Sequence, residues 1–485
     1  MSGAARDATP GVDRWVSLAA VVAAVSVLWL PYLRSSYWLD ESGTAWVVNS
    51  GLGEAIRRSK FEGQSPAYYV VAWVARKIFG HGEVALRIPS LIAALITLWI
   101  VYRLGVALFD RRAGLIAAVS LAVLAPFAFA AVDPRPYAIA VLFLAASTLS
   151  LVRWEQRRAL RHGVGYALFS AAMLYFSYFF SLAFIAHAAY AYAKDREKSG
   201  VSLRDYAVSV GGIVVLAAPS AVHLRALLGQ GDILAWVQQP GIVAKLLSSL
   251  LPIPLVAGLV ASVALTAARK DLHRIRDGEP TSRLLAFTLA IIPPELLFVL
   301  SIVIAPKFFQ PRYYVSFAVG MAVLAGWLIA GLSNRAGRTA AVAFMVVVAA
   351  FTYDGGYRAT QDWRAASRVV NAHADRDELI LFSPGLSSRK IDDPARAGLL
   401  RAPFEAYPVE GRIMLLPFDL VGKNGFRVYN LVTRDLAHTD RFLLVTGFET
   451  GPFRANIIGY AERAGFVSRT LYRQKFLHVT EFDRP

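Results

Sequence analysis

The chain of 485 residues is 56% hydrophobic, has a positive mean hydropathy and carries a formal net charge of +17. A soluble protein of this size does not need so much apolar content, whereas a polytopic membrane protein does, because each helical span takes about 20 apolar residues. Lys and Arg fall in clusters between the apolar runs, as the positive-inside rule predicts, and this argues against nucleic-acid binding. The chain has no cysteine, which excludes a disulfide framework and thiolate metal sites.

The apolar runs predict a polytopic α-helical membrane protein with about 11 spans. The first run, Trp15 to Tyr32, is too long for a signal-peptide core and lacks a clear small-residue cleavage site, so we expect it to be retained. The predicted spans are residues 15–33, 86–108, 113–131, 137–152, 164–177, 179–193, 206–226, 241–268, 284–305, 313–332 and 338–352.

Basic residues gather in every second loop between these spans, and such loops face the cytoplasm. The clusters are Arg103/Arg111/Arg112, Arg153/Arg157/Arg158/Arg161, Lys194/Arg196/Lys198/Arg204, Arg269/Lys270/Arg274/Arg276/Arg283 and Arg335/Arg338. The N-terminus is then cytoplasmic, and an odd number of spans places the C-terminus outside. Residues 34–85 become a long outer loop.

The segment 66–80 within this loop is apolar enough to suggest another span. Counting it as one would move the cluster at 153–161 to the outside and break the charge pattern. Its aromatic face, with Arg76 and Lys77 at the end, instead predicts a helix lying at the membrane interface.

An acidic pair, Asp40-Glu41, follows the first span and is flanked by the aromatic residues Tyr37 and Trp38. An acidic pair in a loop is usually a solvated surface feature. Ionisable groups near the bilayer, however, tend to be functional. A carboxylate here can accept a proton from an attacking hydroxyl, so we expect Asp40 or Glu41 to carry acid/base chemistry.

Positive charges also lie on the predicted outer side, against the usual bias. They are Arg57, Arg58, Lys60, Arg135, Lys307 and Arg312. One interpretation is contact with anionic lipid headgroups, or tolerance of charge in a long loop. The other is a phosphate clamp, because the planar guanidinium of Arg matches phosphate oxygens and cations stabilise a phosphate leaving group.

Asp133 lies in the second outer loop, flanked on its C-terminal side by Pro134 and Pro136, and has two interpretations of equal weight. It is either a cap of the span beginning near Tyr137 or a site residue. Glu295 is expected to pair with a buried cation or line a cavity. His187 and His223 are single histidines on apolar helices and are expected to be packing residues, and no short-range ligand spacing supports a metal site.

The composition changes near Tyr353, where alternating helices and strands predict an extracytoplasmic α/β domain over residues 353–485. The expected elements are helices at 362–373 and 456–464 and strands at 378–382, 441–446 and 471–482. The remaining residues, 1–352, form the predicted transmembrane domain, with the catalytic outer loop at 34–85.

Several short motifs occur in the order and spacing of a known superfamily. They are Leu39-Asp40-Glu41, Ser65-Pro66-Ala67-Tyr68-Tyr69, Phe79-Gly80, Leu86-Arg87-Ile88-Pro89-Ser90, Arg135-Pro136-Tyr137-Ala138, Pro311-Arg312-Tyr313 and Asp362-Trp363-Arg364. Together they resemble the bacterial GT-C-fold glycosyltransferases, relatives of the protein O-mannosyltransferases and of the lipid A aminoarabinose transferase (glycosyltransferase family 39-like). The resemblance covers most of the chain and is strongest over residues 38–140.

The resemblance implies a sugar donor linked to a polyprenyl monophosphate, undecaprenyl in a bacterium, and transfer on the outer face of the inner membrane. Asp40 would match the catalytic aspartate, Asp133 the acidic residue of the second loop, and Arg312 with Tyr313 the motif near the donor phosphate. Relatives often carry Pro, His or Lys where this chain has Gln64 and Ser65.

The aminoarabinose enzyme has a basic residue where this chain has Gly43, so phosphate contacts are expected from Arg57, Arg58 or Arg135. The implied reaction inverts the anomeric centre and has a glycan, lipid or protein acceptor. A monophosphate donor requires no metal on chemical grounds, and a divalent metal stays open.

Two rival interpretations come from other functional classes. A transporter or flippase of a lipid-linked saccharide would also need many spans. Transporters tend to show internal repeats and charges near the bilayer centre, whereas this chain shows no repeat and places its charged clusters at one interface. A membrane-anchored binding or assembly protein using residues 353–485 would keep its function if Asp40 were changed.

Overall fold

The computed structural model describes residues 12–228, 253–268, 279–303, 311–332, 334–385, 394–417, 423–436, 439–447 and 453–485. It divides into two compact units. The first, the helical unit, contains residues 1–33, 87–225 and 237–354. The second, the mixed unit, is built mainly from residues 34–86 and 355–485, so the predicted outer loop and the C-terminal part of the chain share one unit.

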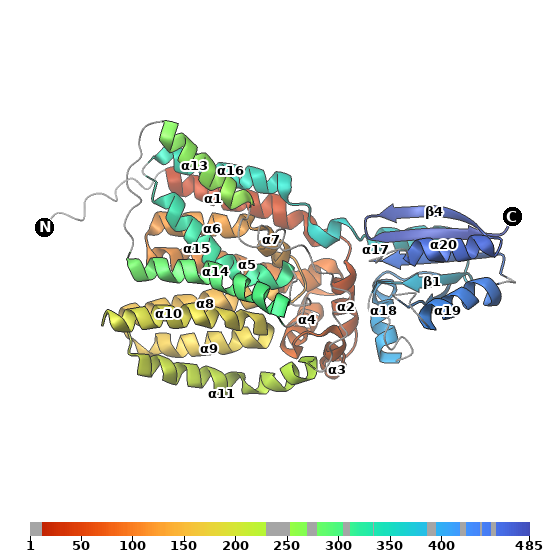
Figure 1. Cartoon of the computed structure of the whole chain (residues 1–485), viewed down its shortest axis with the longest axis horizontal. Helices are drawn as coiled ribbons and strands as arrows, with labels where there is room; N and C mark the ends of the chain where they lie inside the picture. The colour runs from red at the N-terminus through yellow and green to blue at the C-terminus, as the bar shows by residue number, and fades with distance from the viewer. Residues whose placement is uncertain are drawn as a thin grey trace. The chain divides into compact units, whose positions relative to one another are not determined.

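The helical unit consists, over its described residues, of helices joined by short turns (Figure 1). Their bounds are α1 Val12–Ala24, η1 Val25–Trp29, η2 Leu30–Arg34, α5 Glu83–Leu108, α6 Arg111–Val123, α7 Ala125–Ala131, α8 Tyr137–Arg157, α9 Leu160–Phe176, η3 Tyr178–Leu182, α10 Ala183–Arg196, α11 Leu203–Leu228, α13 Ile253–Ala268, α14 Pro280–Val303, η6 Pro311–Phe317, α15 Ala318–Ala330 and α16 Arg335–Thr352.

Among the described residues, seven helical runs are at least 18 residues long and apolar enough to cross a membrane. They begin at Arg14, Glu83, Tyr137, Leu203, Pro280, Arg312 and Arg335. Helices α6 and α7 make an eighth if taken as one span, although they meet at 74°. Pro126, in the first turn of α7, has no N–H to donate to the preceding turn, so the helix breaks there.

The remaining predicted spans fall on α9, α10 and α13, which have 17, 14 and 16 residues in the structure. Residues 241–252 and 304–305 of two predicted spans lie outside the described residues. Helices thus occupy every predicted span wherever the chain is described, and the polytopic α-helical membrane fold is confirmed.

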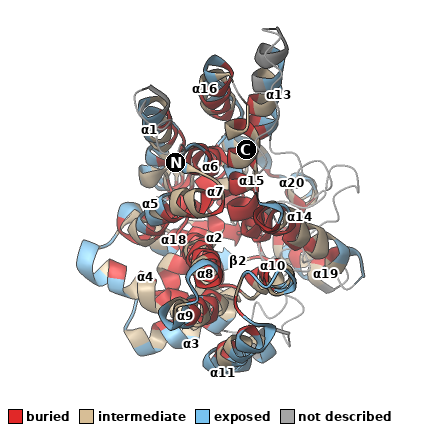
Figure 2. Cartoon of the chain, turned by 90° about the vertical axis from the view of Figure 1, so that its left-hand side faces the viewer, coloured by how far each residue is buried: buried red, intermediate tan, exposed pale blue. Residues whose placement is uncertain are grey.

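Burial varies across the helical unit: α6 and α15 are mostly buried, whereas α11 is largely exposed (Figure 2). Close packing at the centre depends on small residues. A Cβ atom at Gly326 on α15 would lie 2.5 Å from the carbonyl oxygen of Ala113 on α6, so only glycine permits this approach. Exposed apolar side chains on α11, such as Val215 and Val222, suit a surface in contact with lipid.

The mixed unit combines three helices of the predicted outer loop with an α/β domain. The loop helices are α2 Leu39–Val47, α3 Leu52–Glu62 and α4 Pro66–Phe79. The later elements are η7 Gly356–Ala359, α17 Trp363–His373, β1 Leu379–Ser383, α18 Pro394–Ala406, β2 Arg412–Leu415, α19 Lys423–Asn430, η8 Leu431–Asp435, β3 Arg441–Gly447, α20 Phe453–Arg463, β4 Val467–Gln474 and β5 Leu477–Asp483.

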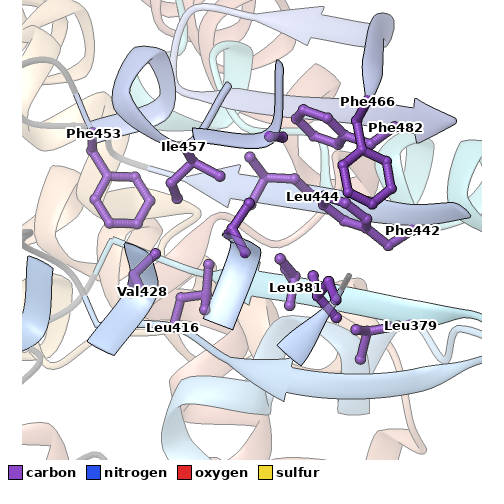
Figure 3. Close-up of a cluster of buried hydrophobic side chains, with 13 residues drawn as sticks. Leu379, Leu381, Leu416, Val428, Phe442, Leu444, Phe453, Ile457, Phe466 and Phe482 are labelled. Carbon is purple, nitrogen blue, oxygen red and sulfur yellow. The ribbon is translucent and has the colours of Figure 1, made fainter. Parts of the chain in front are cut away.

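The five strands form one sheet in the order β2-β1-β3-β5-β4. Strand β1 is parallel to β2 and β3, whereas β5 is antiparallel to β3 and β4. A cluster of buried apolar side chains joins the sheet to α19, η8 and α20 (Figure 3). In this cluster the ring of Phe442 stacks on that of Phe482 with centroids 4.6 Å apart. The small α/β domain is thereby confirmed.

The prediction of one continuous strand at 471–482 was wrong. The structure has two strands, β4 and β5, paired as a hairpin that turns at Lys475 and Phe476. The other predicted elements of this domain are present with shifted ends, and α18, β2 and α19 were not predicted. The segment 66–80 is the 14-residue helix α4, which is not among the helices long enough to span a membrane.

Candidate catalytic site

The acidic pair lies in the first turn of α2 and is not part of an irregular loop. Successive residues of an α-helix point about 100° apart around its axis, so Asp40 and Glu41 have different surroundings. Asp40 is half-buried, whereas Glu41 is fully buried. The two carboxylates therefore differ in their access to solvent, although they are adjacent in sequence.

Glu41 is engaged through both of its carboxylate oxygens. Oε1 accepts a hydrogen bond from Nε of Arg358 at 2.8 Å, and both side chains of this ion pair are 0% exposed. Oε2 accepts the backbone N–H of Trp38 at 3.3 Å, which satisfies a donor that the start of a helix otherwise leaves unpaired. Glu41 thus anchors the first turn of α2.

The residues just before Glu41 are held by the segment 357–364 and by Tyr407, all within the mixed unit. The ring of Trp38 stacks on that of Tyr357 with centroids 4.9 Å apart. The backbone N–H of Leu39 donates to Oε1 of Gln361 at 3.0 Å. The N–H of Tyr37 donates to the Tyr407 hydroxyl at 2.8 Å, and the N–H of Arg364 donates to Oγ of Ser36 at 3.1 Å.

Arg358 was not predicted from the sequence as a site residue. It is a single arginine in the short turn η7, and its partner Glu41 lies 317 residues earlier in the chain. The Asp362-Trp363-Arg364 motif, which directly follows Gln361, was the available signal that this segment belongs near the site. Gly43, where the aminoarabinose enzyme carries a basic residue, is buried in α2 and faces the Glu62 carboxylate and Leu399.

The basic residues of α3 already have partners in the mixed unit. Arg57 and Arg58 both pair with Glu54, and the hydrogen bond from Arg58 holds the pKa of Glu54 below its usual value. Arg58 also donates to the carbonyl of Trp46 at 2.9 Å and lies 4.5 Å from the centroid of its ring. Lys60 is exposed, 5.0 Å from the ring centroid of Phe61.

Asp133 and Arg135 belong to the helical unit, where both are buried in the turn between α7 and α8. The interpretation of Asp133 as the cap of the following span was wrong. Helix α8 begins at Tyr137 with Pro136 as its N-cap residue, and no side chain caps it there. Proline supplies a fixed φ angle near the helix start, so a side-chain cap is not needed to begin α8.

The turn that carries Asp133 is held by the start of α5. Oγ of Ser90 donates to the Asp133 carbonyl at 2.5 Å. One turn earlier, the fully buried Arg87 donates from Nη1 to the carbonyls of Tyr32 and Leu33, at 2.9 and 3.0 Å. The Arg-x-Pro-Ser motif therefore ties the end of the first span and the Asp133 turn to one helix.

The later Arg-Tyr motif, in η6, meets the same region of the helical unit. The ring of Tyr313 lies 6.2 Å from that of Tyr137, centroid to centroid, and stacks on Phe179 at 4.3 Å. The guanidinium of Arg312 lies 5.8 Å from the Tyr313 ring centroid. The structure thus brings together two of the motifs singled out in the sequence. Lys307 lies outside the described residues.

His187 is fully buried, with Nε2 2.9 Å from Oγ1 of Thr148 and Nδ1 3.5 Å from the Tyr166 hydroxyl, as expected of a packing residue. In the described part of the chain, no three His, Asp or Glu residues are grouped to hold a metal ion.

A family model described as dolichyl-phosphate-mannose-protein mannosyltransferase matches residues 63–223. No curated protein sequence gives a significant match. The structure is similar to that of ArnT from Cupriavidus metallidurans in the apo state, with a TM-score of 0.57 and 12% identity over 96% of this chain and 97% of that chain.

The same protein bound to undecaprenyl phosphate gives a TM-score of 0.52 and 11% identity, over 96% of this chain and 98% of that one. An oligosaccharyltransferase of Archaeoglobus fulgidus, tethered with an acceptor peptide, gives a TM-score of 0.50 and 12% identity, over 96% of this chain and 74% of that one. The family model thus matches one part of the helical unit, and the structural similarity shows that the chain has the GT-C fold.

Proposed function

We propose that the protein is an integral-membrane glycosyltransferase that moves a sugar from a polyprenyl monophosphate, undecaprenyl in a bacterium, to a cell-envelope acceptor. The observation that carries this proposal is the contrast within the acidic pair. Glu41 is locked in a buried ion pair, whereas Asp40 keeps a half-buried carboxylate at the start of the same helix. The GT-C fold and the solved structure with undecaprenyl phosphate support the donor class.

In the proposed reaction, a hydroxyl oxygen or other nucleophile of the acceptor attacks the anomeric carbon. The bond between that carbon and the phosphate oxygen breaks as the new bond forms on the opposite face, which inverts the anomeric centre. Asp40 accepts the proton that the nucleophile loses. Polyprenyl phosphate leaves with the bonding electron pair, so it needs cationic stabilisation more than protonation.

Each unit by itself contains candidates for holding the phosphate. Arg135 and Arg312 of the helical unit are favoured, because their motifs meet where Tyr137 approaches Tyr313. Arg57 and Arg58 share the Glu54 carboxylate and would have to exchange it for phosphate. Asp133, next to Arg135 in the same turn, would orient that guanidinium or the acceptor. Lys60 and Lys307 stay candidates for phosphate binding because they are positively charged.

The proposed location is the bacterial inner membrane, with the N-terminus in the cytoplasm. The basic clusters between spans support this orientation. The mixed unit, which carries Asp40, would then face the cell envelope, where a lipid-linked sugar on the outer leaflet meets its acceptor.

The test is transfer by the purified protein in nanodiscs, supplied with a panel of undecaprenyl-phosphate sugars and with membrane extract as the acceptor. Loss of a general base costs about 10² to 10⁴ in rate, so Asp40→Asn should lower transfer at least about 100-fold. Asp377→Asn is the matched control, because Asp377 is an exposed aspartate of the same unit.

Equal transfer by wild type and Asp40→Asn would move the chemistry to another carboxylate, with Asp133 the next to test. Movement of the lipid-linked sugar across the bilayer, without transfer from any donor, would sink the enzyme proposal and favour a flippase.

A further inference from the structure

The start of α2 is fixed almost residue by residue to the C-terminal part of the mixed unit. Ser36, Tyr37, Trp38, Leu39 and Glu41 each contact a residue between Tyr357 and Tyr407. Asp40 lies within this run and keeps a half-buried side chain. The segment that carries the proposed base is therefore held from a part of the chain more than 300 residues later in sequence.

We propose that Arg358 is a positioning residue for Asp40, which it orients by fixing Glu41 in the first turn of α2. This inference rests on the proposed function, in which Asp40 accepts the proton. It also gives the α/β domain a defined role: the domain completes the catalytic site and is more than an accessory module.

Glu41 is suited to anchoring and not to proton transfer. A general base must come within hydrogen-bond reach of the proton it removes. The Glu41 side chain is 0% exposed, and its two oxygens accept from Arg358 and from the Trp38 N–H. Its carboxylate faces protein on both sides, whereas the neighbouring Asp40 has access to solvent.

Arg358 holds Glu41 firmly because each charge would be costly to bury without the other. The Arg358 side chain is also 0% exposed, so solvent does not compete for its guanidinium. Residues 40 and 41 are joined by a rigid helical turn, so fixing the Glu41 side chain also fixes the direction of Asp40, about 100° away around the axis. A displacement of about 1 Å at a reacting group can cost about 100-fold in rate.

The experiment compares Arg358→Met, Glu41→Gln and the double variant in the transfer assay. Each single change should lower kcat by about 10- to 100-fold and leave the donor KM within about twofold, because the geometry changes while donor binding does not. The double variant should be no slower than the slower single variant, because the two residues act as one pair. Arg358→Lys, which keeps the charge, should recover part of kcat.

The matched control is Arg441→Met, which breaks an ion pair to the nearly buried Glu481 at 2.5 Å elsewhere in the same domain. It should leave kcat unchanged. If Arg358→Met behaves like Arg441→Met, or if the two single effects on kcat multiply in the double variant, the positioning role is overturned.

Hydrogen exchange provides a readout that does not need activity. Arg358→Met should speed amide exchange across residues 36–47 while the β3 amides stay protected, and Arg441→Met should spare residues 36–47. Unchanged exchange across 36–47 would overturn the inference even if wild type transferred no sugar. Faster exchange without any wild-type transfer would remove the proposed function but keep the anchoring contact.

Discussion

The Ser90 hydroxyl donates a hydrogen bond to the backbone carbonyl of Asp133 at 2.5 Å. Ser90 follows Arg87 by three residues on α5, so both lie on the same side of that helix. Arg87 holds the carbonyls that end the first span, and Ser90 holds the turn between α7 and α8. The motif thus links the end of the first span to the turn that contains Asp133 and Arg135.

Ser90→Ala should slow transfer without unfolding the protein. A typical hydrogen bond contributes about 1 kcal/mol, so the expected loss in kcat/KM is about fivefold if the Asp133 turn takes part in the reaction. Thr97→Ala is the control, because Thr97 is buried on the same helix and its hydroxyl donates to the carbonyl of Ala93 within that helix. Equal effects of the two changes would show that the Asp133 turn is not needed for transfer.

Arg312→Met should weaken donor binding more than Arg57→Met does. Hydrogen bonds to a charged group contribute about 1.5–3 kcal/mol, so a lost phosphate contact should raise the donor KM by about 10- to 100-fold. Arg57 is 76% exposed and pairs with Glu54, so its change should have an effect of less than about threefold. The measurement is the affinity of the two variants for undecaprenyl phosphate, followed by fluorescence quenching. Weaker binding by Arg57→Met than by Arg312→Met would assign the phosphate to α3.

The α/β domain should lose stability in acid partly through Glu481. Burial opposes ionisation of this carboxyl, but hydrogen bonds from Arg441 and Arg469 outweigh it and hold the pKa of Glu481 below its usual value. A carboxyl whose pKa is depressed on folding stabilises the protein above its unfolded pKa, about 4.3, and that contribution is lost as pH falls through the folded pKa.

Thermal unfolding of wild type and Glu481→Gln between pH 7 and pH 3 tests this expectation. The difference in unfolding temperature between them should be largest at pH 7 and shrink below about pH 4.3. A difference that stays constant over the whole range would show that the contribution of Glu481 does not come from its charge.

The sequence could predict the spans because the bilayer imposes a length and a composition on each of them. The run at 338–352, for example, lies within α16, which begins three residues earlier and ends at the same residue. The hairpin of β4 and β5 was missed because its turn, Lys475-Phe476, has neither Gly nor Pro, so the strand pattern continues across it. Helix α2 was missed because nine residues are too few to show a helical period around the acidic pair.

The candidate site was predictable to the extent that its residues lie in short motifs. Arg135 and Arg312 fall in such motifs, and Asp133 lies two residues before the first of them. The structure brings these two motifs together through Tyr137 and Tyr313. The different surroundings of Asp40 and Glu41 could not be predicted, because they arise from Arg358 in a distant and featureless turn. A contact across 317 residues leaves no local pattern in a single sequence.

The same separation sets an order of events during synthesis. Glu41 is made 317 residues before Arg358, which at about 5–20 residues per second is an interval of about 16–63 s. Throughout that interval, the first turn of α2 lacks its partner while the later membrane helices are still being inserted. A chain that stops after α16 would therefore enter the membrane without the residue that positions its proposed base. Premature termination should then yield an inactive protein and not an unregulated transferase.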